Sequence, residues 1–346
     1  MGLKVLVRTP NHLGDCVMAL PMISEAREAY PGATVTVLTP ESLADLFVGN
    51  PGIDDLWTIP TRHVHGLIGM MKVKEIIARG AFDVGYILPP SFGAASSFKL
   101  AGVKERIGYI ADGRRLLLTK PLPLPEPLNS HHRSVVYFDL LRRGAGVGFE
   151  YASPKLVVND SDRDRANQIL ADSGLGPNDR YVVIGFQAVA VSRRWGTERF
   201  AALAQRIVGG LNLNVVLLGA GDDRKAGDQL MLMSGVGSIH NVAGMTSLRE
   251  SAAILARAEA FVGNDSGPAH LAAASGARVI VLSGADDPRE TSPISTRKTL
   301  IRRERLSCIG CVKNVCPLKG DAFMRCMKEI SVDEVYEALR ESVKGR

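Results

Sequence analysis

The stretch that most constrains the fold runs from Phe261 to Gly284 and reads FVGNDSGPAHLAAASGARVIVLSG. An apolar segment ends at Val262, a turn of small and polar residues follows, and Pro268 suits the first position of a helix, where proline loses no hydrogen bond. Gly276 ends this helix, and residues 278–282 form a continuous apolar run, as in strands that are buried on both faces of a parallel sheet. The stretch therefore predicts a βαβ unit.

The turn before this helix contains the residues that most suggest a ligand. A helix that begins after a Gly/Ser turn presents unpaired N–H groups and the positive end of its dipole, and a phosphate or diphosphate fits there. Asp265, Ser266 and Gly267 form the turn, and His270 lies close enough to contact the same anion or to stack on a sugar. Asp265 and Ser266 can equally be helix caps, and His270 a half-buried helix residue. The turn alone leaves both interpretations open.

The composition is that of an ordinary globular protein. The chain has 346 residues, of which 46% are hydrophobic and 23% charged, so it can bury a large core and is long enough for two domains. No apolar run approaches the roughly 18 to 20 residues that span a bilayer. The N-terminal residues MGLKVLVRTP lack the apolar core and the cleavage site of a secretory signal. We therefore expect a cytoplasmic protein.

The net charge of +6 comes from the last part of the chain. Residues 289–328 include ten Lys or Arg and three acids, a local excess of seven positive charges. Such a run is either a solvated rim or a surface that attracts an anionic partner: a phosphorylated glycolipid, a membrane surface or nucleic acid. We expect no nucleic acid, because Phe323 is the only aromatic residue of the run and base stacking requires aromatic side chains.

The beginning of the chain also predicts a strand, a glycine turn and a helix. Residues 4–9 are an apolar strand, residues 10–15 a loop, and residues 16–30 a helix. Asp15 therefore lies at the carboxyl end of the first strand, where open α/β sheets bind their ligands. Its carboxylate can cap the helix, or it can act as a general base toward a bound hydroxyl group.

The remaining segments continue this alternation in both halves of the chain. The expected strands are residues 34–39, 54–59, 83–88 and 106–109, then 181–186, 214–219 and 238–242. The expected helices are residues 43–48, 62–79, 94–101 and 131–144, then 197–208, 247–260 and 332–343. Residues 120–127 are too rich in proline for a helix and predict an extended surface connector. The fold class is α/β, with two Rossmann-like doubly wound domains facing a cleft.

The domain boundary is expected near residues 144–154. We assign residues 1–155 to the first domain and residues 156–330 to the second. Residues 331–346 form a C-terminal helix that begins with a capping box of Ser331 and Glu334, and packing of this helix on the first domain is one option.

Two further charged pairs follow strands of the second half. Asp222 and Asp223 come after a Gly-Ala-Gly turn, where they can bind a ribose or simply complement the helix dipole. Arg193 and Arg194 follow the strand at residues 181–186, where they can neutralise a diphosphate or be ordinary surface residues.

Four of the five cysteines are close in sequence. Cys308, Cys311, Cys316 and Cys326 have the spacing C-x2-C-x4-C-x9-C, whereas Cys16 is alone. In a cytosolic protein this clustering favours reduced structural thiols or a structural zinc or iron–sulfur site over disulfides.

Together these motifs resemble glycosyltransferase family 9, the ADP-heptose lipopolysaccharide heptosyltransferases. The motifs are P-N-H-L-G-D after the first strand, R-R-W in the second half, N-D-S-G-P-A-H before the last core helix, and the late C-x2-C…C-P…C-M pattern. Their order extends over nearly the whole chain. The resemblance implies a GT-B fold and an inverting transfer of heptose from ADP-L-glycero-D-manno-heptose to the lipopolysaccharide inner core, without a catalytic cofactor.

The resemblance also implies roles for individual residues. Asp15 is the expected general base. Donor binding is expected of a set in the second half: Arg193, Asp222, Asp223, Asp265, Ser266, Gly267 and His270. Acceptor binding is expected of a set in the first half: Asn11, Gly14, Arg62 and Lys72. The implied partners are the ADP-heptose donor, a lipid-linked inner-core saccharide and, through peripheral contact, the inner face of the inner membrane.

Three departures from the family pattern bear on activity. Arg8 is displaced by one position from the basic residue expected beside the proline, and Arg193 replaces a lysine, which keeps the charge but changes its geometry. Residues 187–191 are apolar where hydroxyl or glycine residues often contact phosphate. This loop leaves open a non-catalytic or altered-donor protein of the same fold. An NAD(P)-type oxidoreductase is a further alternative, although Gly219-Ala-Gly221 lacks the third glycine of that motif.

Overall fold

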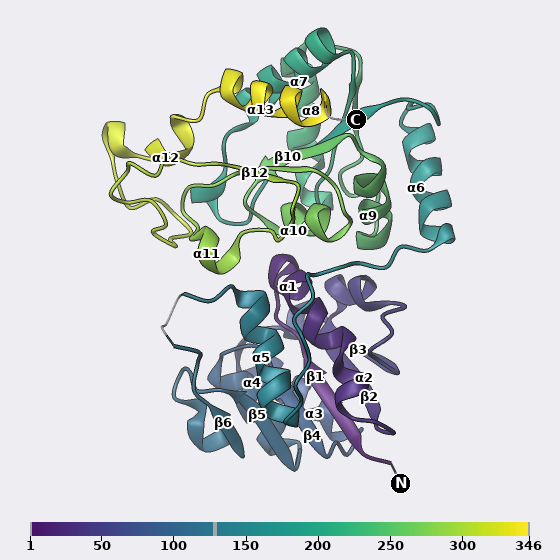
Figure 1. Ribbon diagram of the computed structural model, residues 1–346, viewed down its shortest axis with the longest axis vertical. Coiled ribbons are helices and arrows are strands. Elements are labelled where there is room, and N and C mark those ends of the chain that lie inside the picture. Colours follow the sequence, from purple (N-terminus) through teal and green to yellow (C-terminus); the bar gives the residue numbers. More distant parts are fainter. Residues whose placement is uncertain (1, 127–129, 345–346) are drawn as a thin grey trace. The chain divides into compact units, whose positions relative to one another are not determined.

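The computed structural model describes residues 2–126 and 130–344 (Figure 1). The chain divides into two compact units, Met1–Lys155 and Leu156–Arg346. Among the described residues, no helix is both long enough and apolar enough to cross a bilayer.

The first unit is built on a parallel sheet, six-stranded within the described residues, with the order β3-β2-β1-β4-β5-β6. Its strands are β1 (Lys4–Arg8), β2 (Thr34–Pro40), β3 (Asp55–Ile59), β4 (Val84–Ile87), β5 (Glu105–Tyr109) and β6 (Lys120–Leu122). Its helices are α1 (Leu13–Ser24), α2 (Ala26–Ala29), α3 (Gly66–Ala78), α4 (Phe92–Leu100) and α5 (Arg133–Ala145), with 3₁₀-helices η1 (Glu41–Phe47), η2 (Thr61–His63) and η3 (Arg114–Leu117). Helices α1 and α5 pack together, as do α3 and α4.

The second unit repeats this plan, with the strand order β12-β11-β10-β7-β8-β9. Its strands are β7 (Tyr181–Gly185), β8 (Asn214–Leu217), β9 (Ile239–Asn241), β10 (Ala260–Asn264), β11 (Val279–Leu282) and β12 (Lys298–Ile301). Its helices are α6 (Asp160–Asp172), α7 (Thr197–Leu211), α8 (Arg224–Ser234), α9 (Leu248–Arg257), α10 (Gly267–Ala274), α11 (Pro288–Thr291), α12 (Arg325–Lys328) and α13 (Val332–Lys344), with 3₁₀-helices η4 (Val191–Arg193), η5 (Gly221–Asp223) and η6 (Gly320–Ala322).

The two sheets have the same topology. If the strands of each unit are counted from its own first strand, both orders read 3-2-1-4-5-6, which is the doubly wound Rossmann order. The predicted α/β fold class with two Rossmann-like units is therefore confirmed. The parallel sheets covered by helices follow from the sequence, because continuous apolar strands such as Val5–Val7 are buried on both faces and need helices on each side.

Some predicted elements differ from the structure. The expected connector at residues 120–127 contributes β6 as an edge strand, since Pro121 at the edge of a sheet costs no central ladder bond; residue 127 lies outside the described residues. Helix α1 begins at Leu13 rather than at Cys16, so Asp15 belongs to its first turn. Strand β12 and helix α6 had no counterpart in the sequence prediction.

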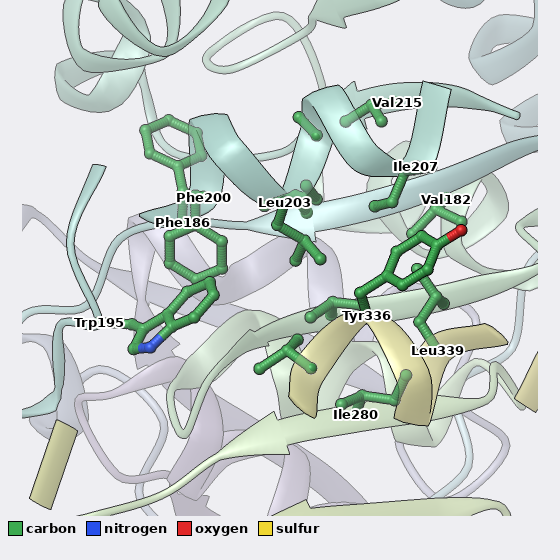
Figure 2. Packing of buried hydrophobic residues seen from close by; sticks show 14 of the residues in the cluster. Val182, Phe186, Trp195, Phe200, Leu203, Ile207, Val215, Ile280, Tyr336 and Leu339 are labelled. Carbon is green, nitrogen blue, oxygen red and sulfur yellow. The ribbon is translucent and has the colours of Figure 1, made fainter. Parts of the chain in front are cut away.

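The C-terminal helix α13 belongs to the second unit, which corrects the option that it packs back on the first domain. Its apolar face carries Val335, Tyr336 and Leu339, which are buried in the core of the second unit. Figure 2 shows Tyr336 and Leu339 facing Ile207 and Val182. The physical reason is that α7 and the neighbouring strands offer this helix a complementary apolar surface.

The buried position of Leu339 gives a stability prediction. We expect Leu339→Ala to lower the free energy of unfolding by about 2 to 4 kcal/mol, because it leaves a cavity between α13 and the sheet. Chemical denaturation followed by circular dichroism measures the change. The control is Leu232→Ala on α8, whose side chain is 82% exposed and for which we expect a change within about 0.5 kcal/mol. Equal effects of the two variants would contradict the described packing of α13.

Candidate functional site

The strand order locates the candidate site in each unit. In a doubly wound sheet, ligands bind beyond the carboxyl ends of the two central strands, where the chain connections leave in opposite directions. The central strands are β1 and β4 in the first unit and β7 and β10 in the second. Asp15 lies in the first turn of α1 after β1, Arg193 at the end of η4 after β7, and Asp265 directly after β10.

Asp15 is held by two side chains of α5. Its Oδ1 accepts hydrogen bonds from Arg133 Nη1 at 3.2 Å and from the Tyr137 hydroxyl at 3.4 Å. Burial raises the pKa of Tyr137 well above its usual value, so this hydroxyl remains protonated and donates to the carboxylate. The helix N-cap is His12, so Asp15 does not cap α1. Sequence reasoning missed Arg133 and Tyr137, because only the packing of α5 on α1 brings them to the motif.

The loop before Asp15 is braced from within the sheet. Arg8 is buried, and its Nη2 donates to Asn11 Oδ1 at 2.6 Å. Burial lowers the pKa of this guanidinium to about 10. Arg8 therefore holds the loop that contains Asn11 and leads to Gly14. Cys16 lies beneath this loop, and burial raises its pKa to about 12, so the thiol stays protonated.

Arg193 lies at the end of η4 in an ion pair that the sequence did not predict. Its Nη2 is 2.5 Å from Asp286 Oδ1, and the side chains are 30% and 2% exposed, respectively. Asp286 follows β11, and its backbone carbonyl accepts a hydrogen bond from Arg302. No motif marks Asp286, and only the adjacency of the β7 and β11 loops reveals it.

The loop that contains Arg193 is fixed at both ends. Asn264, at the end of β10, accepts from Trp195 N at 3.0 Å and donates to the Phe186 carbonyl at 3.1 Å. The Trp195 indole donates to the Ile330 carbonyl at 2.9 Å. Ser192 N donates to the Asn314 carbonyl at 3.1 Å. The R-R-W motif therefore positions one arginine by burying the tryptophan.

Asp265 is buried beside this ion pair. Burial and the charge of Asp286 raise the pKa of Asp265 to about 7, and burial raises the pKa of Asp286 to about 6, in both cases against the opposing charge of Arg193. Oδ2 of each carboxylate has no hydrogen-bond partner among the described residues. Two buried carboxylates therefore lie beside one partly exposed guanidinium.

The start of α10 differs from the capping prediction. Ser266 is the N-cap, but its hydroxyl donates to the Asn264 carbonyl at 3.3 Å and makes no cap within the described part of the chain. The first turn, from Gly267, thus lacks side-chain capping, which suits an anion site. His270 is buried in the helix rather than half-buried.

The acids after β8 have a local role. Asp223 Oδ2 accepts from Ala220 N at 2.9 Å and closes the turn. Asp222 is exposed beside it. Asp223 is itself partly exposed, and the ribose contact of both acids stays a prediction.

The predicted acceptor residues Arg62 and Lys72 lie near the start of α3. Arg62 is exposed, and its Nε donates to the ring of His63 at 3.1 Å. Lys72 forms an ion pair with Glu75 at 2.8 Å. Arg62 follows β3 in η2 and so lies at the carboxyl edge of the first sheet, whereas Lys72 lies further along α3.

The late cysteines, Cys308, Cys311, Cys316 and Cys326, are free thiols in the second unit. Between residues 2–126 and 130–344, no three His, Cys, Asp or Glu side chains are arranged to hold a metal ion. The four thiols nevertheless lie near one another, because burial, together with Cys308, Cys311 and Cys316, raises the pKa of Cys326. The segment is also tied to the sheet, where Val312 N donates to the Ala285 carbonyl at 2.7 Å and Gly310 N to the Gly284 carbonyl at 3.0 Å.

The arginines of the basic run are largely neutralised by acids. The ion pairs are Arg289–Asp287, Arg302–Glu304, Arg303–Glu334, Arg305–Glu329 and Arg325–Glu329. Several of these acids lie outside residues 289–328, which is why counting charges within the run overstates its positive potential. The pairing favours the interpretation as a solvated, structural rim.

These features define a class of protein: a sugar-nucleotide transferase of the GT-B fold, with a carboxylate after β1 and buried charge after β7 and β10. A model of glycosyltransferase family 9 (heptosyltransferase) matches residues 70–321. The chain belongs to this family and is a glycosyltransferase.

Known proteins of this family are similar over most of their length. Lipopolysaccharide heptosyltransferase 2 of Escherichia coli K12 is 27% identical over 312 residues, which cover 87% of this chain and 88% of that protein. The solved E. coli ADP-heptose lipopolysaccharide heptosyltransferase II has a TM-score of 0.79 at 23% identity and covers 99% of both chains. A family 9 glycosyltransferase of Veillonella parvula has a TM-score of 0.84 at 21% identity, covering 99% of this chain and 98% of that one.

The raised carboxyl pKa values predict a pH dependence of stability. Between about pH 4 and pH 7 the folded chain binds more protons at Asp265 and Asp286 than the unfolded chain, so stability falls as pH rises through this window. We expect Asp265→Asn to be more stabilising at pH 8 than at pH 4, because it removes one of these acids. Thermal melts at the two pH values measure this, with Asp222→Asn, an exposed acid, as the control. An equal effect of Asp265→Asn on stability at both pH values would refute the raised pKa of Asp265.

Proposed function

We propose that this protein is an inverting, heptosyltransferase II-like enzyme. It transfers heptose from ADP-L-glycero-D-manno-heptose to the lipopolysaccharide inner core. The observation that carries this proposal, beyond family membership, is Asp15 at the carboxyl end of β1 with one oxygen held by Arg133 and Tyr137. The names of the similar proteins, which are heptosyltransferases acting on lipopolysaccharide, supply the donor and acceptor classes.

The proposed reaction is a single displacement with Asp15 as the general base. Both contacts from α5 use Oδ1, and Oδ2 is the oxygen that we assign to the acceptor hydroxyl. As Oδ2 takes the proton, the hydroxyl oxygen bonds to the anomeric carbon and the bond from that carbon to the diphosphate oxygen breaks. ADP leaves with the bonding electrons, and the anomeric configuration inverts.

The donor is proposed to bind the second unit, residues 156–330. Arg193 and the uncapped first turn of α10, with Ser266 and Gly267, would stabilise the diphosphate charge. Asp265 and His270 would contact the heptose side of the site, and Asp222 with Asp223 the ribose. No metal or other cofactor is proposed in this reaction, because the guanidinium and backbone N–H groups supply the charge stabilisation.

The acceptor is proposed to bind the first unit, residues 1–155, through Asn11, Gly14, Arg62 and Lys72. Its lipid would remain in the inner leaflet of the inner membrane, with the enzyme cytoplasmic and in peripheral contact. Helix α3 supports this contact, because Leu67 and Ile68 are 73% and 78% exposed and Met71 is exposed beside them. Residues 62–79 also contain four Lys or Arg and one acid, which suits an anionic surface.

A non-catalytic protein of the same fold is the second candidate. The observation that favours it is the apolar 187–191 loop. Val189 in this loop is 91% exposed, so an apolar side chain lies where a phosphate-binding group would be expected. The NAD(P)-type oxidoreductase has no comparable support, since the chain belongs to a glycosyltransferase family. Release of ADP from ADP-heptose with heptose-deficient core separates an enzyme from a binding protein, and a panel of other sugar nucleotides tests for an altered donor.

The role of Asp15 is tested by Asp15→Asn. We expect kcat to fall by about 10² to 10⁴-fold, because the amide cannot accept the proton. The affinity for ADP-heptose should stay within a few fold, since Asp15 belongs to the acceptor side. Coupled ADP-release kinetics and calorimetry measure the two quantities, with Glu41→Gln, an exposed acid of the same unit, as the control. Normal turnover in Asp15→Asn would exclude it as the base.

The membrane contact is tested by the double variant Leu67→Ser, Ile68→Ser. We expect at least about tenfold weaker binding to phosphatidylglycerol vesicles, because two aliphatic side chains no longer enter the interface. Vesicle co-sedimentation measures this, with phosphatidylcholine vesicles as the uncharged comparison. The matched control is Leu232→Ser, Met233→Ser, which removes two exposed apolar side chains of α8. Equal binding of both double variants would refute α3 as the contact.

A further inference from the structure

The ion pair between Arg193 and Asp286 is asymmetric in its exposure. The Asp286 side chain is 2% exposed, whereas that of Arg193 is 30% exposed. The guanidinium therefore lies on the outer side of the pair. One edge of it contacts the carboxylate, and Nε, which is buried, has no hydrogen-bond partner among the described residues. The exposed part of the guanidinium thus remains for a ligand, and the ion pair with Asp286 already sets the orientation of the side chain.

Asp286 is itself part of a rigid support. It follows β11, a strand with fully buried side chains, and Arg302 donates to its backbone carbonyl. The preceding residues Gly284 and Ala285 accept hydrogen bonds from the 310–312 segment. Asp286 therefore has little freedom to move with Arg193.

A fixed counter-ion matters for a side chain as long as arginine. A free arginine loses rotamer entropy when a ligand immobilises it. A partner that holds the side chain before binding removes part of this loss, which raises affinity by preorganisation. Ser192 adds to this effect, because its N–H and hydroxyl bind the backbone carbonyls of Asn314 and Lys313.

We infer that Asp286 is a positioning residue that holds Arg193 in the orientation required by the diphosphate of the sugar nucleotide. This inference rests on the proposed function, in which Arg193 binds that diphosphate. Asp286 does not contact the substrate in this scheme and acts through Arg193. The charge of the Asp286 carboxylate also raises the pKa of Asp265.

The charged groups around Asp286 determine the expected pH behaviour. Arg193 and Arg302 face it from the β7 and β12 loops, and Asp265 faces it from the β10 loop. Lys298 on β12 acts on Asp265, and Asp287 and Glu304 lie next to Arg302. The charge of Asp286 is one of the causes that raise the pKa of Asp265, so its neutralisation should lower that pKa.

The experiment compares Asp286→Ala and Asp286→Asn in the full-length protein. We expect Asp286→Ala to raise KM for ADP-heptose and Kd for ADP about tenfold with a smaller effect on kcat. Asp286→Asn keeps an oxygen that accepts from Arg193 and should restore both constants to within about threefold. In Asp286→Asn, the midpoint of the pH profile of ADP affinity should move to lower pH, because Asp265 titrates without its charged neighbour. Circular dichroism confirms that each variant is folded.

The outcomes separate this inference from the proposed function. The reference variant is Arg193→Ala, which should weaken ADP binding at least as much as Asp286→Ala. If Arg193→Ala leaves ADP binding unchanged, the proposed role of Arg193 is wrong. If Arg193→Ala weakens ADP binding but Asp286→Ala does not, Arg193 needs no positioning and the inference is overturned. Equal losses in Asp286→Ala and Asp286→Asn, with an unshifted pH profile, would also overturn it.

Discussion

Parallel strands that are buried on both faces can present polar chemistry only at their ends, and this constraint organises both units. The order β3-β2-β1-β4-β5-β6 and its counterpart in the second sheet place the β1, β7 and β10 loops at the two topological switch points. The carboxylate of Asp15 and the charges of Arg193 and Asp265 all follow these central strands. Their positions are thus consequences of the strand order rather than of the loops themselves.

In both units the candidate site residue is held by a neighbour from another element. Asp15 on α1 is held by Arg133 and Tyr137 on α5, and Arg193 by Asp286 after β11. Such contacts fix rotamers before a ligand arrives. In the second unit, burial raises the pKa values of both Asp265 and Asp286, and the charge of Asp286 raises that of Asp265 further. The charge of Arg193 opposes both shifts.

The C-terminal part of the chain stabilises the second unit. Helix α13 completes the core under α7, as Figure 2 illustrates with Tyr336 and Leu339. The 310–316 segment, which includes Cys311 and Cys316, hydrogen-bonds to the backbone of the Arg193 loop and of the residues before Asp286. The late cysteine motif therefore belongs to a structural support, and its thiols are free. The basic run serves the same support through its ion pairs with nearby acids.

The sequence by itself determined the α/β class, the repeated doubly wound plan and the positions of Asp15, Arg193 and Asp265 at strand ends. These properties depend on local patterns of apolar runs, glycine turns and prolines, which neighbouring residues encode. Only the tertiary structure decided that Arg133, Tyr137 and Asp286 complete the sites, that Ser266 does not cap α10, and that α13 packs in the second unit. The physical reason is that these contacts join residues that are close in space but far apart in sequence, so their geometry depends on how helices and strands pack.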